Sequence, residues 1–114
     1  MLVEIIKAYE AQDKDPISFE RGVTVQVLRE DSGFPNWFWC RAPSSKEGWV
    51  HRPFLAEAAT TTKSTRPYSA RELTVDGHES GTTIESLDGW IYIRLDSGVE
   101  GWLPQTHVQT GVAF

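Results

Sequence analysis

An internal repeat is the feature that most constrains this chain. Residues 37–49 have a gap-free counterpart in residues 90–102, and in both stretches eleven positions separate the first tryptophan from the glycine of a Gly-Trp pair. The match extends upstream, where Tyr-Glu-Ala-Gln starting at Tyr9 corresponds to Tyr-Ser-Ala-Arg starting at Tyr68. A repeat of this kind predicts one structural unit built twice.

The two copies differ in length at two places. Residues 9–17 of the first copy are three longer than residues 68–73 of the second, and residues 31–36 are three longer than residues 87–89. Both places are polar and rich in turn-forming residues, as expected for loops on a shared scaffold.

Each copy has the pattern of short β-strands. Residues 23–28, 37–41 and 90–95 are β-branched or aromatic and alternate in character, which is typical of strands. Clusters of Gly, Pro, Asn, Asp and Ser separate them and predict turns. Many short strands without a convincing helical stripe predict an all-β fold of two small β-barrels in tandem.

The domain boundaries follow from the repeat and from a polar run, Thr-Thr-Thr-Lys-Ser-Thr, at residues 60–65. We expect a first barrel at residues 1–57, a linker at 58–64, a second barrel at 65–110 and a tail at 111–114. Domains of this size can fold alone, although with little stability to spare.

The composition narrows the function. The net charge of -5 provides no field of Lys and Arg for phosphate backbones, so no nucleic-acid partner is expected. Cys40 is the one cysteine, which rules out an intrachain disulfide or a thiolate metal cluster. No signal peptide or membrane span is recognisable, so a cytoplasmic protein without a membrane partner is expected.

The ordered motifs of both copies resemble those of SH3 domains. Residues 9–19 resemble the opening motif and RT loop of that family, residues 19–22 its diverging turn, and Trp37 the tryptophan of its binding surface. Residues 72–75, 88–90 and 101–104 resemble the same landmarks in the second copy. The pair is similar to bacterial tandem variant SH3 proteins, which implies two SH3-like barrels and a non-enzymatic role in binding proteins or peptides.

The resemblance implies one aromatic groove per barrel. The first groove is expected at Tyr9, Asp13, Asp15, Trp37, Trp49, His51 and Phe54. The second is expected at Tyr68, Glu72, Trp90, Trp102, Pro104 and His107. Such grooves hold the rings of a polyproline II helix, while a carboxylate selects an Arg or Lys beside them.

Several groove positions depart from the family pattern. Lys7, Arg66 and His107 stand where aromatic residues are usual, His51 replaces a proline, and Pro16 replaces an acid. The cations at Lys7 and Arg66 would favour acidic ligands or internal partners over proline-rich ones. The class of ligand therefore stays open, with proline-rich and acidic segments both considered.

The tryptophans allow a second interpretation, in which they fill two small cores. Partial exposure is expected for Trp37 and Trp90, which follow turns, whereas Trp49 and Trp102 could equally pack inside. Trp39 is expected to face outward. If the four groove tryptophans, Trp37, Trp49, Trp90 and Trp102, were all buried, the chain would be a structural or scaffold protein with occluded grooves.

Other functions have weaker support. Cys40 is expected to be a buried, inert thiol rather than a nucleophile, and the three histidines lack the short spacing of metal ligands. No catalytic residue, metal or cofactor is therefore expected. Cell-wall binding, known for bacterial SH3-type modules, would require export.

Overall fold

The structure, a computed structural model, describes residues 1–12 and 15–110. Over these residues the expected all-β fold is confirmed. The strands are β1 (Leu2–Ile5), β2 (Ser18–Phe19), β3 (Thr24–Glu30), β4 (Trp37–Arg41), β5 (Glu47–His51), β6 (Thr61–Lys63), β7 (Tyr68–Ser69), β8 (Ser80–Leu87), β9 (Trp90–Leu95), β10 (Glu100–Pro104) and β11 (Val108–Thr110). Two short 3₁₀ turns, η1 (Arg52–Phe54) and η2 (Gln105–His107), interrupt them.

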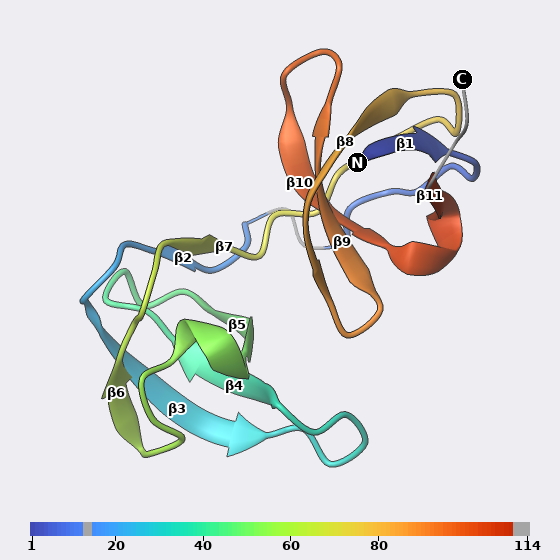
Figure 1. Cartoon of the computed structure of the whole chain (residues 1–114). Helices are drawn as coiled ribbons and strands as arrows, with labels where there is room; N and C mark the ends of the chain where they lie inside the picture. Colours follow the sequence, from blue (N-terminus) through green and yellow to red (C-terminus); the bar gives the residue numbers. More distant parts are fainter. Residues whose placement is uncertain (13–14, 111–114) are drawn as a thin grey trace. The chain divides into compact units, whose positions relative to one another are not determined.

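The chain forms two compact units that do not follow the order of the sequence. Unit 1 combines residues 1–14 with residues 71–114, and unit 2 is residues 15–70. In Figure 1, β1 accordingly lies beside β8 and β11, whereas β6 lies beside β3.

Unit 1 is built on a five-stranded antiparallel sheet in the order β10-β9-β8-β1-β11. The N-terminal strand β1 lies between β8 and β11, with Val3 opposite Gly81 on one side and Thr110 on the other. Tyr9 adds a bridge to Val75. The core is a cluster of nine buried apolar residues, namely Val3, Ile5, Leu73, Val75, Ile91, Ile93, Leu95, Leu103 and Val108.

Unit 2 repeats this arrangement. Its main sheet has the order β5-β4-β3-β6, and a bridge from Leu55 to Ser64 takes the fifth place. A second pairing joins β2 to β7, with Phe19 opposite Tyr68. Both units also carry the same irregularity, a register shift after Val27 in β3 and after Thr83 in β8. The structure thus supports the sequence alignment strand by strand.

The registers show that the two copies have exchanged their leading segments, by which we mean residues 2–11 of the first copy and residues 61–70 of the second. Val3 of the first copy lies opposite Gly81 of the second copy. Its counterpart in the second copy, Thr62, lies opposite Val25, which is the counterpart of Gly81 in the first copy. In the same way Tyr9 bridges Val75. Each leading segment therefore completes the sheet of the other copy.

The observed units differ from the expected domains. The expected first barrel at 1–57 is divided, because residues 1–14 belong to unit 1, and the expected second barrel at 65–110 loses residues 65–70 to unit 2. The expected linker at 58–64 contains β6, since β-branched threonines suit a strand once backbone partners are present. The expected tail at 111–114 lies outside the described residues.

Candidate ligand-binding surfaces

An aromatic cluster in unit 1 is centred on Tyr9. Its ring meets the ring of Trp90 edge to face, with centroids 6.4 Å apart, and the imidazole of His107 at 5.2 Å. Pro104 lies opposite Trp90 across β9 and β10. The half-buried Trp90 confirms the partial exposure expected for it.

Glu72 fixes the polar edge of this cluster. Its Oε1 accepts a hydrogen bond from the Tyr9 hydroxyl at 3.0 Å and another from the backbone N–H of Gln12 at 2.8 Å. Burial first, and then the hydrogen bond and negative charge of Glu72, raise the pKa of Tyr9 to about 12. The phenol therefore stays a protonated donor at physiological pH.

Trp102 does not join this cluster. It is only 6% exposed and packs against Tyr92 with ring centroids 5.0 Å apart. Its backbone N–H donates to the carbonyl of Arg71, and its own carbonyl accepts from Leu73, so backbone bonds hold it beneath the 71–73 segment. Of the two interpretations open for Trp102, core packing is the one observed.

Unit 2 carries two ring pairs, one formed by His51, which precedes η1, and one formed by Phe54, the last residue of η1. Trp37 meets the buried His51 with centroids 4.9 Å apart, and Phe54 meets Tyr68 at 4.5 Å. The guanidinium of Arg66 lies 4.1 Å from the centre of the Phe54 ring, a cation–π contact. Trp37 is half-buried, as expected.

Trp49 faces away from these pairs. Its ring meets Trp39 at 5.1 Å, and the Arg29 guanidinium covers both indoles at 5.4 and 5.5 Å. The carbonyl of Trp49 accepts a hydrogen bond from the Tyr68 hydroxyl at 2.9 Å. Trp49 on β5 and Trp39 on β4 lie directly opposite each other, and both are half-buried.

The structure thus groups the expected site residues differently from the sequence alignment. Tyr9 lies with Trp90 and His107 rather than with Trp37, and Tyr68 lies with Phe54 rather than with Trp90. The reason is the exchange of the leading segments, which carry the two tyrosines. The first set shares unit 2 (Trp37, Trp49, His51 and Phe54) and the second set shares unit 1 (Glu72, Trp90, Trp102, Pro104 and His107), but Trp49 and Trp102 pack apart from the other rings.

The expected acidic residues of the first groove have a different fate. Asp13 lies outside the described residues. Asp15 is exposed and pairs with the Lys46 ammonium at 2.5 Å. In unit 1 the carboxylate beside the aromatic cluster is that of Glu72, which accepts from Tyr9 rather than lying with Tyr68.

Each unit has an Arg–Glu ion pair between neighbouring strands that the sequence interpretation did not include. Glu47 accepts hydrogen bonds from the Trp39 indole at 2.8 Å and from Arg41 at 2.7 Å, and these two contacts lower its pKa. Arg94 and Glu100 repeat the ion pair in unit 1 at 2.7 Å. The sequence signal for these ion pairs was that Arg41 and Glu47 align with Arg94 and Glu100 in the repeat.

The next residues to consider are those that could take part in catalysis or bind a metal ion. Burial raises the pKa of the Cys40 thiol to about 12, so it is protonated and a poor nucleophile. Among residues 1–12 and 15–110, no group of three or more His, Cys, Asp or Glu side chains could hold a metal ion.

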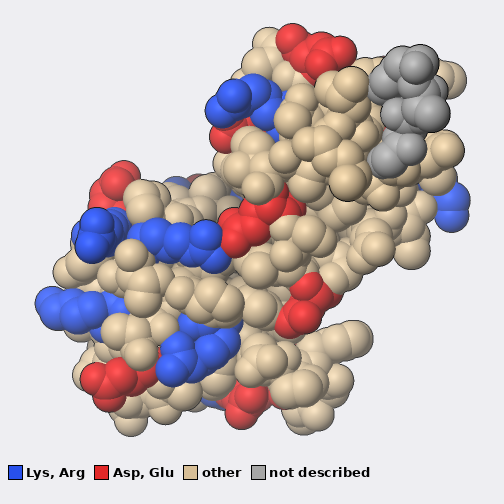
Figure 2. Space-filling view, in the orientation of Figure 1, with Lys and Arg blue, Asp and Glu red and all other residues tan. Residues whose placement is uncertain are grey.

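None of the described helices is long and apolar enough to cross a membrane. Figure 2 shows acidic and basic side chains interspersed on the face in view.

Comparison with known proteins supports the family resemblance for part of the chain. The model of the variant SH3 domain matches residues 4–58. SH3 and PX domain-containing protein 2A of Mus musculus and of Homo sapiens is 40% identical over 53 residues, which is 46% of this chain. The Danio rerio protein of the same name is 40% identical over 50 residues. The match covers only 4% of the length of each relative, and no solved structure matches the chain.

These findings assign residues 4–58 to a variant SH3 domain in sequence, and SH3 domains are in general protein-interaction modules. The matched stretch runs across the point, between residues 12 and 15, where the chain leaves unit 1 for unit 2. Sequence family and structural unit are therefore not the same set of residues here.

Proposed function

We propose that this chain is a non-enzymatic binding module of two SH3-like barrels, and that it holds protein or peptide ligands against the aromatic clusters at Trp90 and Trp37. The observation that carries the proposal is the half-burial of both tryptophans, each with a second ring beside it. Tryptophan anchored in this way is the residue that most often dominates the binding energy of an interface.

The cluster in unit 1 suits a ligand with an extended, ring-bearing backbone. The edge-to-face rings of Tyr9 and Trp90 can flank a proline ring, because polyproline II is already extended and loses little entropy on binding. The Glu72 carboxylate, which also orients Tyr9, would attract a cationic side chain beside that ring.

The cluster in unit 2 contains a cation. The guanidinium of Arg66 lies over the Phe54 ring, and the imidazole of His51 lies beside Trp37. We therefore propose that unit 2 prefers an acidic ligand segment.

A panel of fluorescently labelled peptides in solution tests both statements. It would contain proline-rich peptides with one arginine and the same peptides with glutamate in its place, with affinities measured by fluorescence anisotropy. Trp90→Ala should weaken the arginine-bearing series and Trp37→Ala the glutamate-bearing series, each by tenfold or more, since such anchors contribute about 2 kcal/mol.

Phe34→Ala is the matched control. Phe34 is an exposed aromatic residue at 71% and belongs to neither cluster, so its removal should leave both affinities unchanged. Binding that survives both tryptophan substitutions would refute the use of these surfaces.

The alternative is a structural or scaffold role with the aromatic surfaces covered. The burial of Trp102 favours it for one tryptophan only. Acrylamide quenching of single-tryptophan variants separates the two functions, because Trp37 and Trp90 should be quenched strongly relative to Trp102 if they are open.

A further inference from the structure

The exchange of leading segments points to a short connection in the second copy as its cause. We propose that Arg71 and Glu72 form a hinge too short to fold back, so that each copy must lend its tyrosine to the aromatic cluster of the other. This inference rests on the proposed function only where it speaks of ligands.

The hydrogen bonds of unit 2 show what closure of one copy would require. There the Ala70 N–H donates to the carbonyl of Ile17 at 2.9 Å, beside the pairing of Tyr68 with Phe19. Leu73 is the counterpart of Ile17 in the second copy. The same bond made within the second copy would join Ala70 to Leu73.

Such a bond would leave Arg71 and Glu72 as a two-residue hairpin loop. Two-residue loops use type I′ or II′ turns, which need positive φ and select Asn-Gly, Asp-Gly or glycine. Arg-Glu is neither, and among the described residues neither Arg71 nor Glu72 has a positive φ. The second copy therefore runs on extended, with Ala70 in unit 2 and Arg71 in unit 1.

The first copy has no such restriction. The bond from Ala11 to Ile17 would enclose residues 12–16, a five-residue loop. However, once residues 61–70 occupy the strand position beside β3, that position is no longer available to residues 2–11. The exchange is thus reciprocal, although only the second copy imposes it.

The side chains of the two leading segments also match their present places. Val3 and Ile5 are 2% exposed within the apolar core of unit 1. The corresponding Thr62 and Ser64 of unit 2 are buried too, but their hydroxyls have backbone partners.

Those partners are specific to unit 2. Thr62 Oγ1 accepts from the N–H of Glu57 at 2.9 Å, and Ser64 Oγ donates to the carbonyl of Glu20 at 2.5 Å. Without the exchange, two hydroxyls would enter an apolar core and two aliphatic side chains would face these backbone groups. Both changes are unfavourable because buried polar groups would lose their hydrogen bonds.

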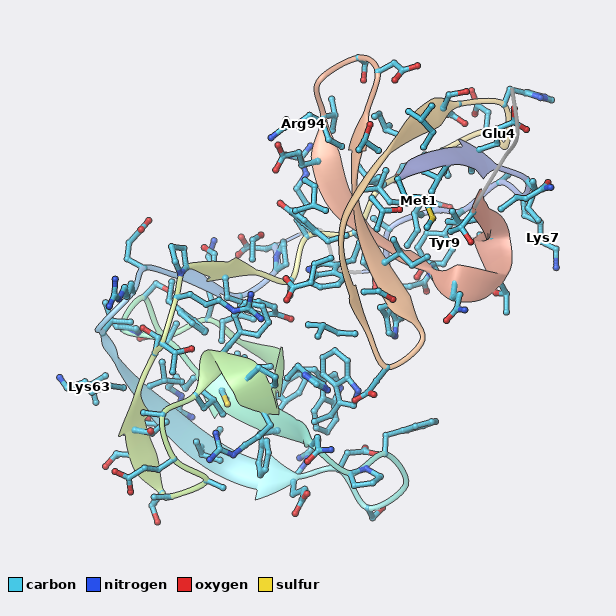
Figure 3. The ribbon with its side chains drawn as sticks, viewed as in Figure 1. Met1, Glu4, Lys7, Tyr9, Lys63 and Arg94 are labelled. Atoms are coloured by element: carbon cyan, nitrogen blue, oxygen red, sulfur yellow. The ribbon has the colours of Figure 1, made fainter. Side chains whose placement is uncertain are left out.

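For ligand binding, the consequence is that Tyr9 serves the Trp90 cluster and Tyr68 serves unit 2. Figure 3 shows Glu4, Lys7 and Tyr9 with the strands of unit 1, while Lys63, the counterpart of Glu4, lies on β6. Removing residues 1–12 should therefore impair the surface of the second copy, not that of the first.

Engineered disulfides test the exchange without any ligand. Glu4 lies opposite Ser80, and Lys63 lies opposite Thr24. Directly opposite residues in antiparallel strands have Cα atoms about 4.5–5.5 Å apart, a separation that a disulfide can span. The matched pairs for unexchanged copies are Glu4 with Thr24 and Lys63 with Ser80.

The full chain would be prepared as four double variants, and Cys40 can remain because it is fully buried. Glu4→Cys/Ser80→Cys and Thr24→Cys/Lys63→Cys should oxidise to monomeric cross-linked species on a non-reducing gel. Glu4→Cys/Thr24→Cys and Lys63→Cys/Ser80→Cys should not. Cross-linking of the second set would overturn the exchange, and cross-linked dimers would show that it occurs between chains instead.

Lengthening the hinge tests its cause. Insertion of Gly-Asn-Gly between Arg71 and Glu72 gives a five-residue loop, and cross-linking of Glu4→Cys/Thr24→Cys should rise from background to a measurable fraction. The same insertion between Asp88 and Gly89, the other short loop of the second copy, should change nothing. An unchanged pattern with the longer hinge would refute its role, whereas absence of peptide binding by the unaltered chain would refute only the proposed function.

Discussion

At the scale of single residues, Glu79 shows how one side chain can organise a turn. Its carboxylate accepts hydrogen bonds from the backbone N–H groups of Asp76, Gly77 and His78 at 2.8, 3.0 and 3.0 Å. Partial burial alone would raise the pKa of this carboxyl group, but the backbone donors outweigh it and the pKa is lowered. The ionised form therefore stabilises the fold.

We predict that Glu79→Gln lowers the free energy of unfolding by about 1 kcal/mol at pH 7, a value discounted for exposure to solvent. Because the folded pKa lies below the unfolded value, the contribution of Glu79 is present above the unfolded pKa and is lost as the pH falls through the folded pKa. Urea unfolding at pH 7 and at pH 3 measures the difference. Glu20→Gln, at an exposed position, is the control and should leave the free energy of unfolding at pH 7 close to that of the wild type.

At the scale of elements, a glycine in the same place of each copy lets a strand pass close to the core. A Cβ atom on Gly101 would lie 2.9 Å from Leu73 Cγ, and one on Gly48 would lie 2.7 Å from Ile17 Cγ2. The close contact thus recurs between β10 and Leu73 and between β5 and Ile17, which explains why the glycine of the Gly-Trp pair is present in both copies.

We predict that Gly101→Ala destabilises the protein by roughly 1–3 kcal/mol, the usual range for overpacking a core. Thermal unfolding followed by circular dichroism would record it. Gly33→Ala should stay near wild type, since a Cβ atom there meets only Asp31 Oδ2 at 3.6 Å. Equal unfolding temperatures for both variants would contradict the close approach at Gly101.

At the scale of the whole molecule, the two units make different demands on the chain. Unit 2 is one continuous stretch, residues 15–70, and contains β2 to β7. Unit 1 needs both ends of the chain, because Val3 and Ile5 fill part of its core. The boundaries of the structural units therefore do not coincide with the boundaries of the sequence repeat.

We predict that residues 15–70 alone fold to a monomer with cooperative unfolding, since small domains of this size can be stable by themselves. Residues 59–114 alone should not, because they lack β1 and cannot close their own hairpin. Denaturant titration and size-exclusion chromatography would compare the two fragments. A cooperative monomer from 59–114 would contradict the role of the hinge.

Much of this fold could be predicted from local patterns. The repeat, the all-β class, strands at residues 37–41 and 90–95 and the half-burial of Trp37 and Trp90 all follow from residue types and spacing, which depend on neighbours along the chain. The burial of Trp102 could not be decided in this way, because it depends on the 71–73 segment that covers it.

The sequence by itself determined that one unit occurs twice and that residues 37–41 and 90–95 form strands. Only the tertiary structure decided which copy each leading segment completes. Because both copies have the same order of strands, neighbours along the chain do not reveal the pairing. The pairing depends on contacts distant in sequence, namely those of Val3 opposite Gly81 and of Thr62 opposite Val25.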